Sequence, residues 1–170
     1  MSPIEQLSRL EAARDEALAK LSARAPFARF IGVEMERRGD ELTARLRFDP
    51  KLIGSPLLPA LHGGGIGAFL EITAILTLAW GQIWDEIEAG GERAEAIAAG
   101  ALPPLPKTVD ITINYLRAGR ARDAFARASV TKHGRRVSNV RVEGWQEERS
   151  KPMATAHGHF LLRGDEAEAE

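Results

Sequence analysis

An almost uncharged run in the middle of the chain limits most strongly what this sequence can fold into. Between Lys51 and Asp85 the only formal charge belongs to Glu71. Residues 61 to 84 have the length and composition of one helix that is apolar on nearly every side. Such a helix is stable in water only when other elements cover it, so the rest of the chain must wrap around it.

We do not interpret this run as a membrane span. Its apolar centre, Ile66 to Trp80, is interrupted by Gly67 and Glu71 and is shorter than the roughly 20 residues that cross a bilayer. Residues 1 to 21 are charged throughout, so we expect no signal peptide. The run therefore predicts a core helix, in a protein that does not have a membrane as partner.

The composition is typical of one globular domain. The 170 residues are 44% apolar and 28% charged, which is enough for one full core and too little for two. A net charge of -1 gives no general attraction to nucleic acid, so we expect none as a partner. The lack of cysteine excludes disulfides and thiolate chemistry and fits a cytoplasmic location.

Segments of helical and strand periodicity flank the long helix. Residues 1–25 begin with a capping box, Ser2 to Glu5, and predict an amphipathic helix. After it the pattern predicts two strands joined by a turn at Arg38-Gly39-Asp40, and beyond residue 106 it predicts four strands with short connections. In the third of these, the apolar phase slips between Val137 and Val140, which suggests a bulge or a strand buried on both faces.

This order of elements predicts an α+β fold in which an antiparallel sheet wraps around the long helix. The N-terminal helix is an addition to that architecture. We divide the chain into the helix at 1–25, a main domain at 26–163 and an acidic tail at 164–170, which we expect to be disordered because it has nothing to bury. Residues 85–106 predict a helical extension and a loop, either a lid or a plain surface helix.

Glu71 and the glycines before it are the candidate site. Burying an unpaired carboxylate costs on the order of several kcal/mol, so such a group is compensated by partners or used chemically. The glycines after His62 leave free N–H groups at the positive end of the helix dipole, where a developing oxyanion is stabilised and a substrate can approach closely. Gly63 is therefore a candidate oxyanion donor, and Gly64 a candidate substrate contact.

Gly63 and Glu71 are too far apart to act on the same carbonyl within one chain. Eight residues of helix separate them, or about 12 Å at a rise of 1.5 Å per residue. A two-fold dimer with antiparallel long helices would set Gly63 of one subunit opposite Glu71 of the other. We therefore expect a homodimer, or a dimer of dimers, with its active sites at the subunit interface.

The motif His62-Gly63-Gly64 followed by Glu71, with residues 106–117 and 132–135 downstream, resembles the hotdog-fold acyl-CoA thioesterases of the phenylacetate-pathway type. The resemblance covers about residues 27 to 162 by element order. It implies the hotdog fold and hydrolysis of a fatty or aryl acyl-CoA to the free acid and coenzyme A. In this family the glycine N–H binds the thioester carbonyl, and an acidic residue nine positions after the histidine attacks or activates water. Gly63 and Glu71 occupy these positions.

The sequence departs from the family pattern just before the motif. Many relatives have an Asn or Gln there that contacts the carboxylate or the water, whereas this chain has Ser55-Pro56. Ser55 is a candidate for a weaker hydrogen-bonding role. His62 fits a substrate contact and a turn histidine equally well. Because water is the second substrate, the resemblance implies no cofactor.

Basic residues concentrate between positions 117 and 141, a segment that contains eight of them and a single acidic residue, Asp123. Arginine and turn-borne lysine suit the phosphates of coenzyme A. We single out four that flank turns: Arg117, Lys132, Arg135 and Arg136. A solvated sheet face is the commoner explanation for any one of them.

Other chemistries fit the sequence less well. His157 and His159 share a face of the last strand, but with no cysteine or carboxylate motif beside them we expect no metal site. The sequence has no Gly-x-Ser-x-Gly elbow of a serine hydrolase. Three alternatives stay open: Glu71 as a structural carboxylate bound to a buried arginine or to the backbone, a hotdog enoyl-CoA hydratase or dehydratase, and a non-catalytic acyl-CoA-binding module.

Overall fold

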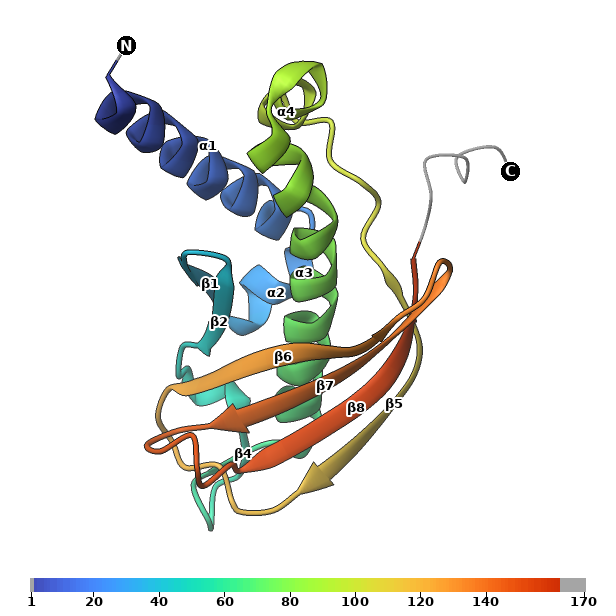
Figure 1. Cartoon of the computed structure of the whole chain (residues 1–170). Helices are drawn as coiled ribbons and strands as arrows, with labels where there is room; N and C mark the ends of the chain where they lie inside the picture. Colours follow the sequence, from blue (N-terminus) through green and yellow to red (C-terminus); the bar gives the residue numbers. More distant parts are fainter. Residues whose placement is uncertain (1, 163–170) are drawn as a thin grey trace.

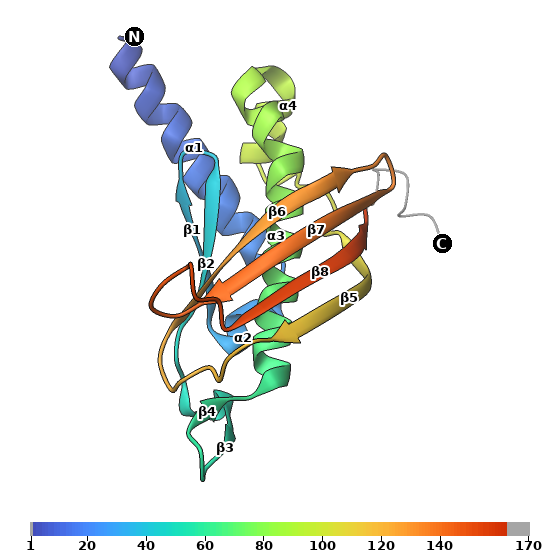
Figure 2. The same ribbon diagram turned by 60° about the horizontal axis from the view of Figure 1, so that its bottom comes forward.

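The computed structural model describes residues 2–162, and at its centre lies the long helix α3, Gly63–Ala89. A six-stranded antiparallel sheet in the order β1-β2-β6-β7-β8-β5 curls around this helix (Figure 1). Its strands are β1 (Val33–Arg38), β2 (Glu41–Leu46), β5 (Lys107–Tyr115), β6 (Ala124–His133), β7 (Val137–Trp145) and β8 (Ala154–Leu161). Turning the molecule brings the sheet forward and shows β5 as one of its two edges (Figure 2).

The prediction that the apolar run forms a buried core helix is confirmed. Phe69, Leu70 and Ile83 of α3 are fully buried. The helical extension expected after residue 84 is present, because α3 continues past Trp84 to Ala89, where Ile87 still packs into the core. At 27 residues the helix is long and apolar enough to cross a membrane, but 67% of its most apolar window is buried inside the fold. Burial, rather than shortness, identifies it as a core helix.

The N-terminal helix α1 spans Pro3–Ala23 and begins with the predicted capping box. The Glu5 N–H donates to the Ser2 hydroxyl at 3.3 Å, and the Ser2 N–H donates to the Glu5 carboxylate at 2.6 Å. Only the second half of α1 packs against the body: Leu18 and Leu21 are buried, whereas Ile4 is exposed. The predicted apolar face of α1 is therefore buried along only half of its length.

Arg14 fastens α1 to the central helix. The side chain is buried, and its guanidinium lies 4.1 Å from the centre of the Trp84 ring. It donates hydrogen bonds to Glu11 at 2.6 Å and to Glu88 at 2.7 Å. Paired in this way, a buried cation joins two helices that are distant in sequence.

Three short elements were not predicted from the sequence. A helix of six residues, α2 (Pro26–Ile31), follows α1 and ends at Gly32, whose φ of 85° is left-handed. A 3-10 turn over Pro50–Leu52 and a hairpin of β3 (Ile53–Ser55) and β4 (Ala60–Leu61) precede α3. They are too short to produce a periodic pattern.

A β-bulge at Val109 changes which residues of β5 face the helix. Thr108 pairs with Phe160 and Asp110 pairs with His159, so Val109 has no partner in the ladder. The alternation of apolar and polar residues from Val109 onward predicts that Val109 faces the core with Ile111 and Ile113, and this is wrong. Val109 is 61% exposed, whereas Thr108 faces α3. The extra residue shifts the phase of the strand on one side of the bulge.

The predicted irregularity in the strand that begins at Val137 was also wrong. β7 pairs with β8 without interruption, and its even-numbered residues face the core. The apolar phase slips only because one of these inward residues is polar: Ser138, fully buried, shares a hydrogen bond of 3.2 Å with Nδ1 of His133. The register shift lies in β6, between Val130 and Lys132.

Residues 85–106 form the end of α3, a second helix α4 (Gly91–Ala98) and an extended segment. Ile97 of α4 is fully buried. The Arg24 side chain donates to the carbonyl oxygens of Leu102 and Pro103 at 2.9 and 2.8 Å. These contacts tie the segment to α1, which favours a packed surface helix over a lid. The acidic tail predicted at 164–170 lies outside the described residues.

Candidate active site

His62 caps the helix on which the candidate site is built. Its Nδ1 accepts a hydrogen bond from the Gly64 N–H at 2.9 Å, and its carbonyl accepts from the Ile66 N–H at 3.0 Å. The hairpin before α3 holds His62 in place, because a Cβ on Gly54 would lie 2.9 Å from the His62 Cα. His62 is thus an N-cap, and the Gly64 N–H is already occupied.

Gly63 is the first residue of α3 and offers a free donor. Its carbonyl accepts a hydrogen bond from the Tyr115 hydroxyl at 2.7 Å. Its N–H has no acceptor among residues 2–162, as is normal for the first N–H of a helix. Because this N–H lies at the positive end of a long helix, it suits an oxygen that gains negative charge.

Glu71 lies two turns further along α3 and is half-buried. One carboxylate oxygen accepts a hydrogen bond from the Thr108 hydroxyl at 2.5 Å. None of the ion pairs within the described range includes Glu71. An anionic carboxylate that lacks a cation and is held by one neutral donor retains lone pairs that can take a proton from water.

Three contacts define how α3 and β5 cross. Gly63 meets Tyr115, a Cβ on Gly67 would lie 2.8 Å from the Ile113 Cδ1, and Glu71 meets Thr108. The helix therefore runs along β5 in the opposite direction to the strand. Gly63 and Glu71 mark the two ends of this crossing, so one chain does not bring them together.

Thr108 and Tyr115 are site residues that the sequence did not indicate. No residue type marks the bulge at Val109 that turns the Thr108 side chain toward α3. Tyr115 was interpreted only as a strand residue. Its hydroxyl reaches the helix start from the end of β5.

The predicted basic residues fall into two groups at opposite ends of the sheet. Arg117 follows the end of β5, on the side of Gly63. Lys132 is the second-last residue of β6, at the opposite end of the sheet, and Arg135 and Arg136 lie in the turn between β6 and β7. All four side chains are exposed. Within one subunit they do not form a single cluster.

Ser55 ends β3 and pairs with Ala60. In the part of the chain that the structure describes, its hydroxyl makes no hydrogen bond and does not reach Glu71. Its suggested role in holding the carboxylate stays a prediction.

The histidines of β8 belong to the outer face of the sheet. His159 lies 2.9 Å from Asp110 and lowers the pKa of that carboxyl group. Among residues 2–162 no group of three potential metal ligands is present.

Two comparisons with known proteins decide the family. Residues 88–153 match the family model of the thioesterase superfamily. The medium/long-chain acyl-CoA thioesterase YigI of Escherichia coli (strain K12) is 32% identical over 128 residues, which cover 72% of this chain and 77% of that protein. The chain belongs to the thioesterase superfamily. This thioesterase is accordingly a thioester hydrolase, as the motif at His62 to Glu71 predicted.

Solved structures agree on the fold of this thioesterase. A protein of Chromobacterium violaceum is 35% identical, with a TM-score of 0.60, and the match covers 94% of this chain and 99% of that one. A protein from Shewanella oneidensis related to the thioesterase superfamily is 22% identical, with a TM-score of 0.71 and coverage of 96% and 100%. The predicted hotdog fold, with its additional N-terminal helix, is confirmed.

Proposed function

We propose that this thioesterase hydrolyses medium- or long-chain acyl-CoA thioesters to the free acid and coenzyme A. The observation that carries the proposal is the free Gly63 N–H at one end of the α3–β5 crossing and the carboxylate of Glu71, without a cation in the described range, at the other. We take the length of the acyl chain from the relatives in Escherichia coli and Salmonella typhimurium, which are named medium/long-chain acyl-CoA thioesterases. An aryl acyl-CoA is the alternative substrate. A cytoplasmic location stays a prediction.

The proposed active form is a homodimer joined along β5. This strand is an edge of the sheet, and its outer N–H and C=O groups offer a template for a second strand. Antiparallel pairing about a two-fold axis near Ile111 and Thr112 would set Tyr115 of one subunit beside Thr108 of the other, because these residues lie on either side of that centre. Because Gly63 contacts Tyr115 and Glu71 contacts Thr108, Gly63 of one subunit would lie near Glu71 of the other. Each dimer would therefore hold two equivalent sites.

In such a site the two groups divide the chemistry. The Gly63 N–H and the helix dipole stabilise the oxyanion that forms on the thioester carbonyl. Glu71 of the other subunit acts as a general base on water, or as a nucleophile that forms a transient anhydride. Thr108 donates to one oxygen of Glu71 and leaves the other oxygen directed to the reaction. Gly64 contributes space for the substrate, since its N–H is engaged by His62.

The dimer would also bring the two basic groups to one site. Arg117 accompanies Gly63, whereas Lys132, Arg135 and Arg136 lie at the end of the sheet near Thr108. Two-fold pairing of β5 therefore places the first group of one subunit beside the second group of the other, around a phosphate-bearing substrate.

Thiol release from acyl-CoAs of short, medium, long and aromatic chains tests the function. We expect activity on medium and long chains, and a fall in kcat of about 10²- to 10⁴-fold in Glu71→Gln, with the oligomer intact. Glu86→Gln, on the same helix and paired with Arg93 at the surface, is the matched control. Full activity in Glu71→Gln, or binding of acyl-CoA without thiol release by the wild type, would refute the proposal.

A further inference from the structure

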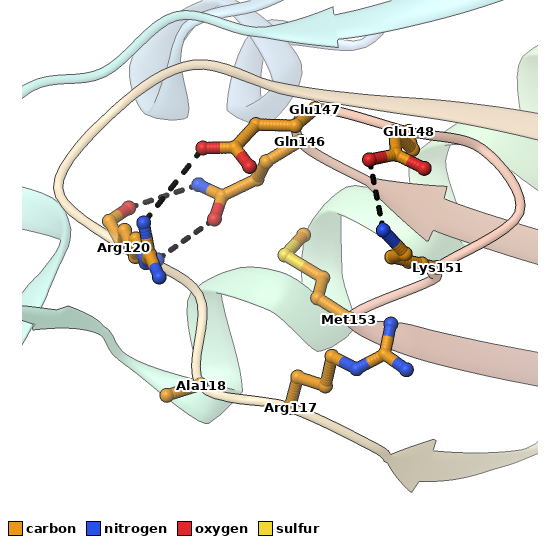
Figure 3. Close-up of a pocket in the computed structure, with 8 residues that line it drawn as sticks. All are labelled: Arg117, Ala118, Arg120, Gln146, Glu147, Glu148, Lys151 and Met153. Atoms are coloured by element: carbon orange, nitrogen blue, oxygen red, sulfur yellow. Dashed lines mark hydrogen bonds and ion pairs between the residues drawn. The ribbon is translucent and has the colours of Figure 1, made fainter.

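A pocket of about 400 Å³ opens at the end of the sheet where β5 finishes (Figure 3). One wall is the loop that follows β5, with Arg117 and Arg120, and the other is the loop between β7 and β8, with Glu148 and Lys151. The side chain of Met153 lies between them. The pocket is of the size that holds a small molecule or one part of a larger one.

The pocket lies next to the Gly63 end of the candidate site. Tyr115, which binds the Gly63 carbonyl, is two residues before Arg117. The carbonyl of Gly119, in the pocket loop, accepts a hydrogen bond from the Leu61 N–H at 2.8 Å, just before α3. A substrate whose thioester lies at Gly63 can therefore extend toward the pocket without crossing the core.

Hydrogen bonds hold both walls in a fixed geometry. The Gln146 side chain accepts from the Arg120 N–H at 2.8 Å and donates to the carbonyls of Arg120 and Arg122 at 2.9 and 3.1 Å. The Arg117 N–H donates to the Met153 carbonyl at 3.0 Å. A loop fixed in this way loses little conformational entropy when a ligand binds.

Among the residues that the structure describes, one cation of the pocket lacks an acidic partner. Arg120 faces Glu147 at 3.7 Å, and Lys151 pairs with Glu148 at 2.9 Å at the surface. Arg117 has no acidic partner within residues 2–162. The Arg117 guanidinium is therefore suited to bind a phosphate group. Lys151 can assist it, because an ion pair at the surface is weak and leaves the lysine able to change partner.

We infer that this pocket binds the nucleotide end of coenzyme A, an inference that rests on the proposed function. Arg117 and Lys151 bind a phosphate of the nucleotide, and the Glu148 carboxylate accepts a hydrogen bond from the ribose. Ala118 and the thioether of Met153 lie under the base, where sulfur–aromatic contact is favourable. The pantetheine arm spans the distance from there to Gly63.

The other basic group, Lys132, Arg135 and Arg136, which the proposed dimer would bring to the same site from the partner subunit, is the competing binder of the nucleotide. Those side chains stand exposed in or beside a hairpin turn at the opposite end of the strands. A turn offers charge, whereas the pocket at Arg117 also offers walls and an apolar floor. A nucleotide needs charge for its phosphates, walls that hold it and an apolar surface for its base, and so we assign it to the pocket.

Substrates that differ only at the nucleotide test this assignment. Kinetics are measured with octanoyl-CoA and with octanoyl-pantetheine, which has the same thioester and lacks the nucleotide. We expect the double variant Arg117→Ala/Lys151→Ala to raise KM for octanoyl-CoA about 10-fold or more, with kcat unchanged. KM for octanoyl-pantetheine should not change. Arg141→Ala, which removes an exposed arginine from the outer face of the sheet, is the control.

Three results would overturn the assignment: an unchanged KM for octanoyl-CoA in the double variant, an equal rise for both substrates, or the selective rise in Arg135→Ala/Arg136→Ala instead. Calorimetric titration with coenzyme A separates this test from the proposed function. If the wild type hydrolyses no thioester, the function fails, and the pocket is then judged by whether coenzyme A binds the wild type and not the double variant.

Discussion

The hydroxyl of Thr108 is a small group on which the orientation of Glu71 depends. Its hydrogen bond of 2.5 Å is the one polar contact of the carboxylate in the described range, and it fixes one of two oxygens. Without it the side chain is free to rotate about χ2 and χ3, and a base that is poorly positioned transfers protons more slowly.

Replacement of Thr108 by Val should therefore lower kcat about 10-fold and leave KM almost unchanged. Thr108→Ser, which keeps the donor, should restore most of the activity. Steady-state kinetics give both values. Thr112→Val, on the opposite face of the same strand, is the matched control. Equal activity of the Val and Ser variants would show that the hydrogen bond has no part in positioning.

Asp123 shows how a single carboxylate makes stability depend on pH. It accepts from the Phe48 N–H at 2.7 Å and from two nitrogens of Arg45 at 2.9 and 2.7 Å, and these contacts lower its pKa. Because the folded pKa lies below the unfolded one, the stabilisation is complete above the unfolded pKa of about 3.9 and is lost as the pH falls through the folded pKa.

We expect Asp123→Asn to reduce the free energy of unfolding by about 1 kcal/mol at pH 7, a modest value because the group is partly exposed. The difference from the wild type should shrink below about pH 4. Urea titrations between pH 3 and 8 measure it. Asp40→Asn, in an exposed turn, is the control, and a difference that does not depend on pH would contradict this explanation.

At the scale of elements, the crossing of α3 and β5 needs a residue without a side chain. A Cβ on Gly67 would lie 2.8 Å from the Ile113 Cδ1, whereas Gly81 on the same helix has no atom within 4 Å of its Cβ position. The first glycine allows close approach, and the second only lowers helix propensity.

Gly67→Ala should cost about 1–2 kcal/mol of stability, and Gly81→Ala should add up to about 1 kcal/mol. Ile113→Val removes the clashing methyl group. The double variant Gly67→Ala/Ile113→Val should thus be less destabilised than the sum of the two single variants. Urea unfolding of all four proteins checks these values, and strict additivity would argue against a steric origin.

The elements that could be predicted are those with long periodic patterns. The capping box of α1, the buried α3 and the four strands after residue 106 follow from propensity and apolar spacing. The bulge at Val109 and the inward Ser138 escaped prediction because each depends on the neighbouring strand. The same holds for the site: Gly63 and Glu71 stand out in the sequence, whereas Thr108 is recognised only from its contact.

At the scale of the whole molecule, the proposed dimer makes each site dependent on two chains. Gly63→Pro removes the oxyanion donor with little structural cost, because proline is favoured at the first position of a helix. The preceding His62 already has φ -64° and ψ 133°, which suit a residue before proline.

Mixing two inactive variants tests this shared arrangement. Gly63→Pro and Glu71→Gln should each lose most of the activity, and dimers unfolded and refolded together should recover about a quarter of the wild-type value. Half of the re-paired dimers are mixed, and each of these holds one intact site. Each variant refolded alone is the control. Absence of recovery, with mixed dimers present by mass spectrometry, would show that one chain supplies both groups.

The unpaired Val109 also bears on how this strand tolerates changes in length. Since the residues on either side of it already face the directions they would have in an uninterrupted ladder, deletion of Val109 joins Thr108 to Asp110 without turning either one over. A deletion elsewhere in β5 would invert every side chain beyond it. Loss of one amino acid is therefore tolerated at this point, and Glu71 keeps its hydrogen bond with Thr108.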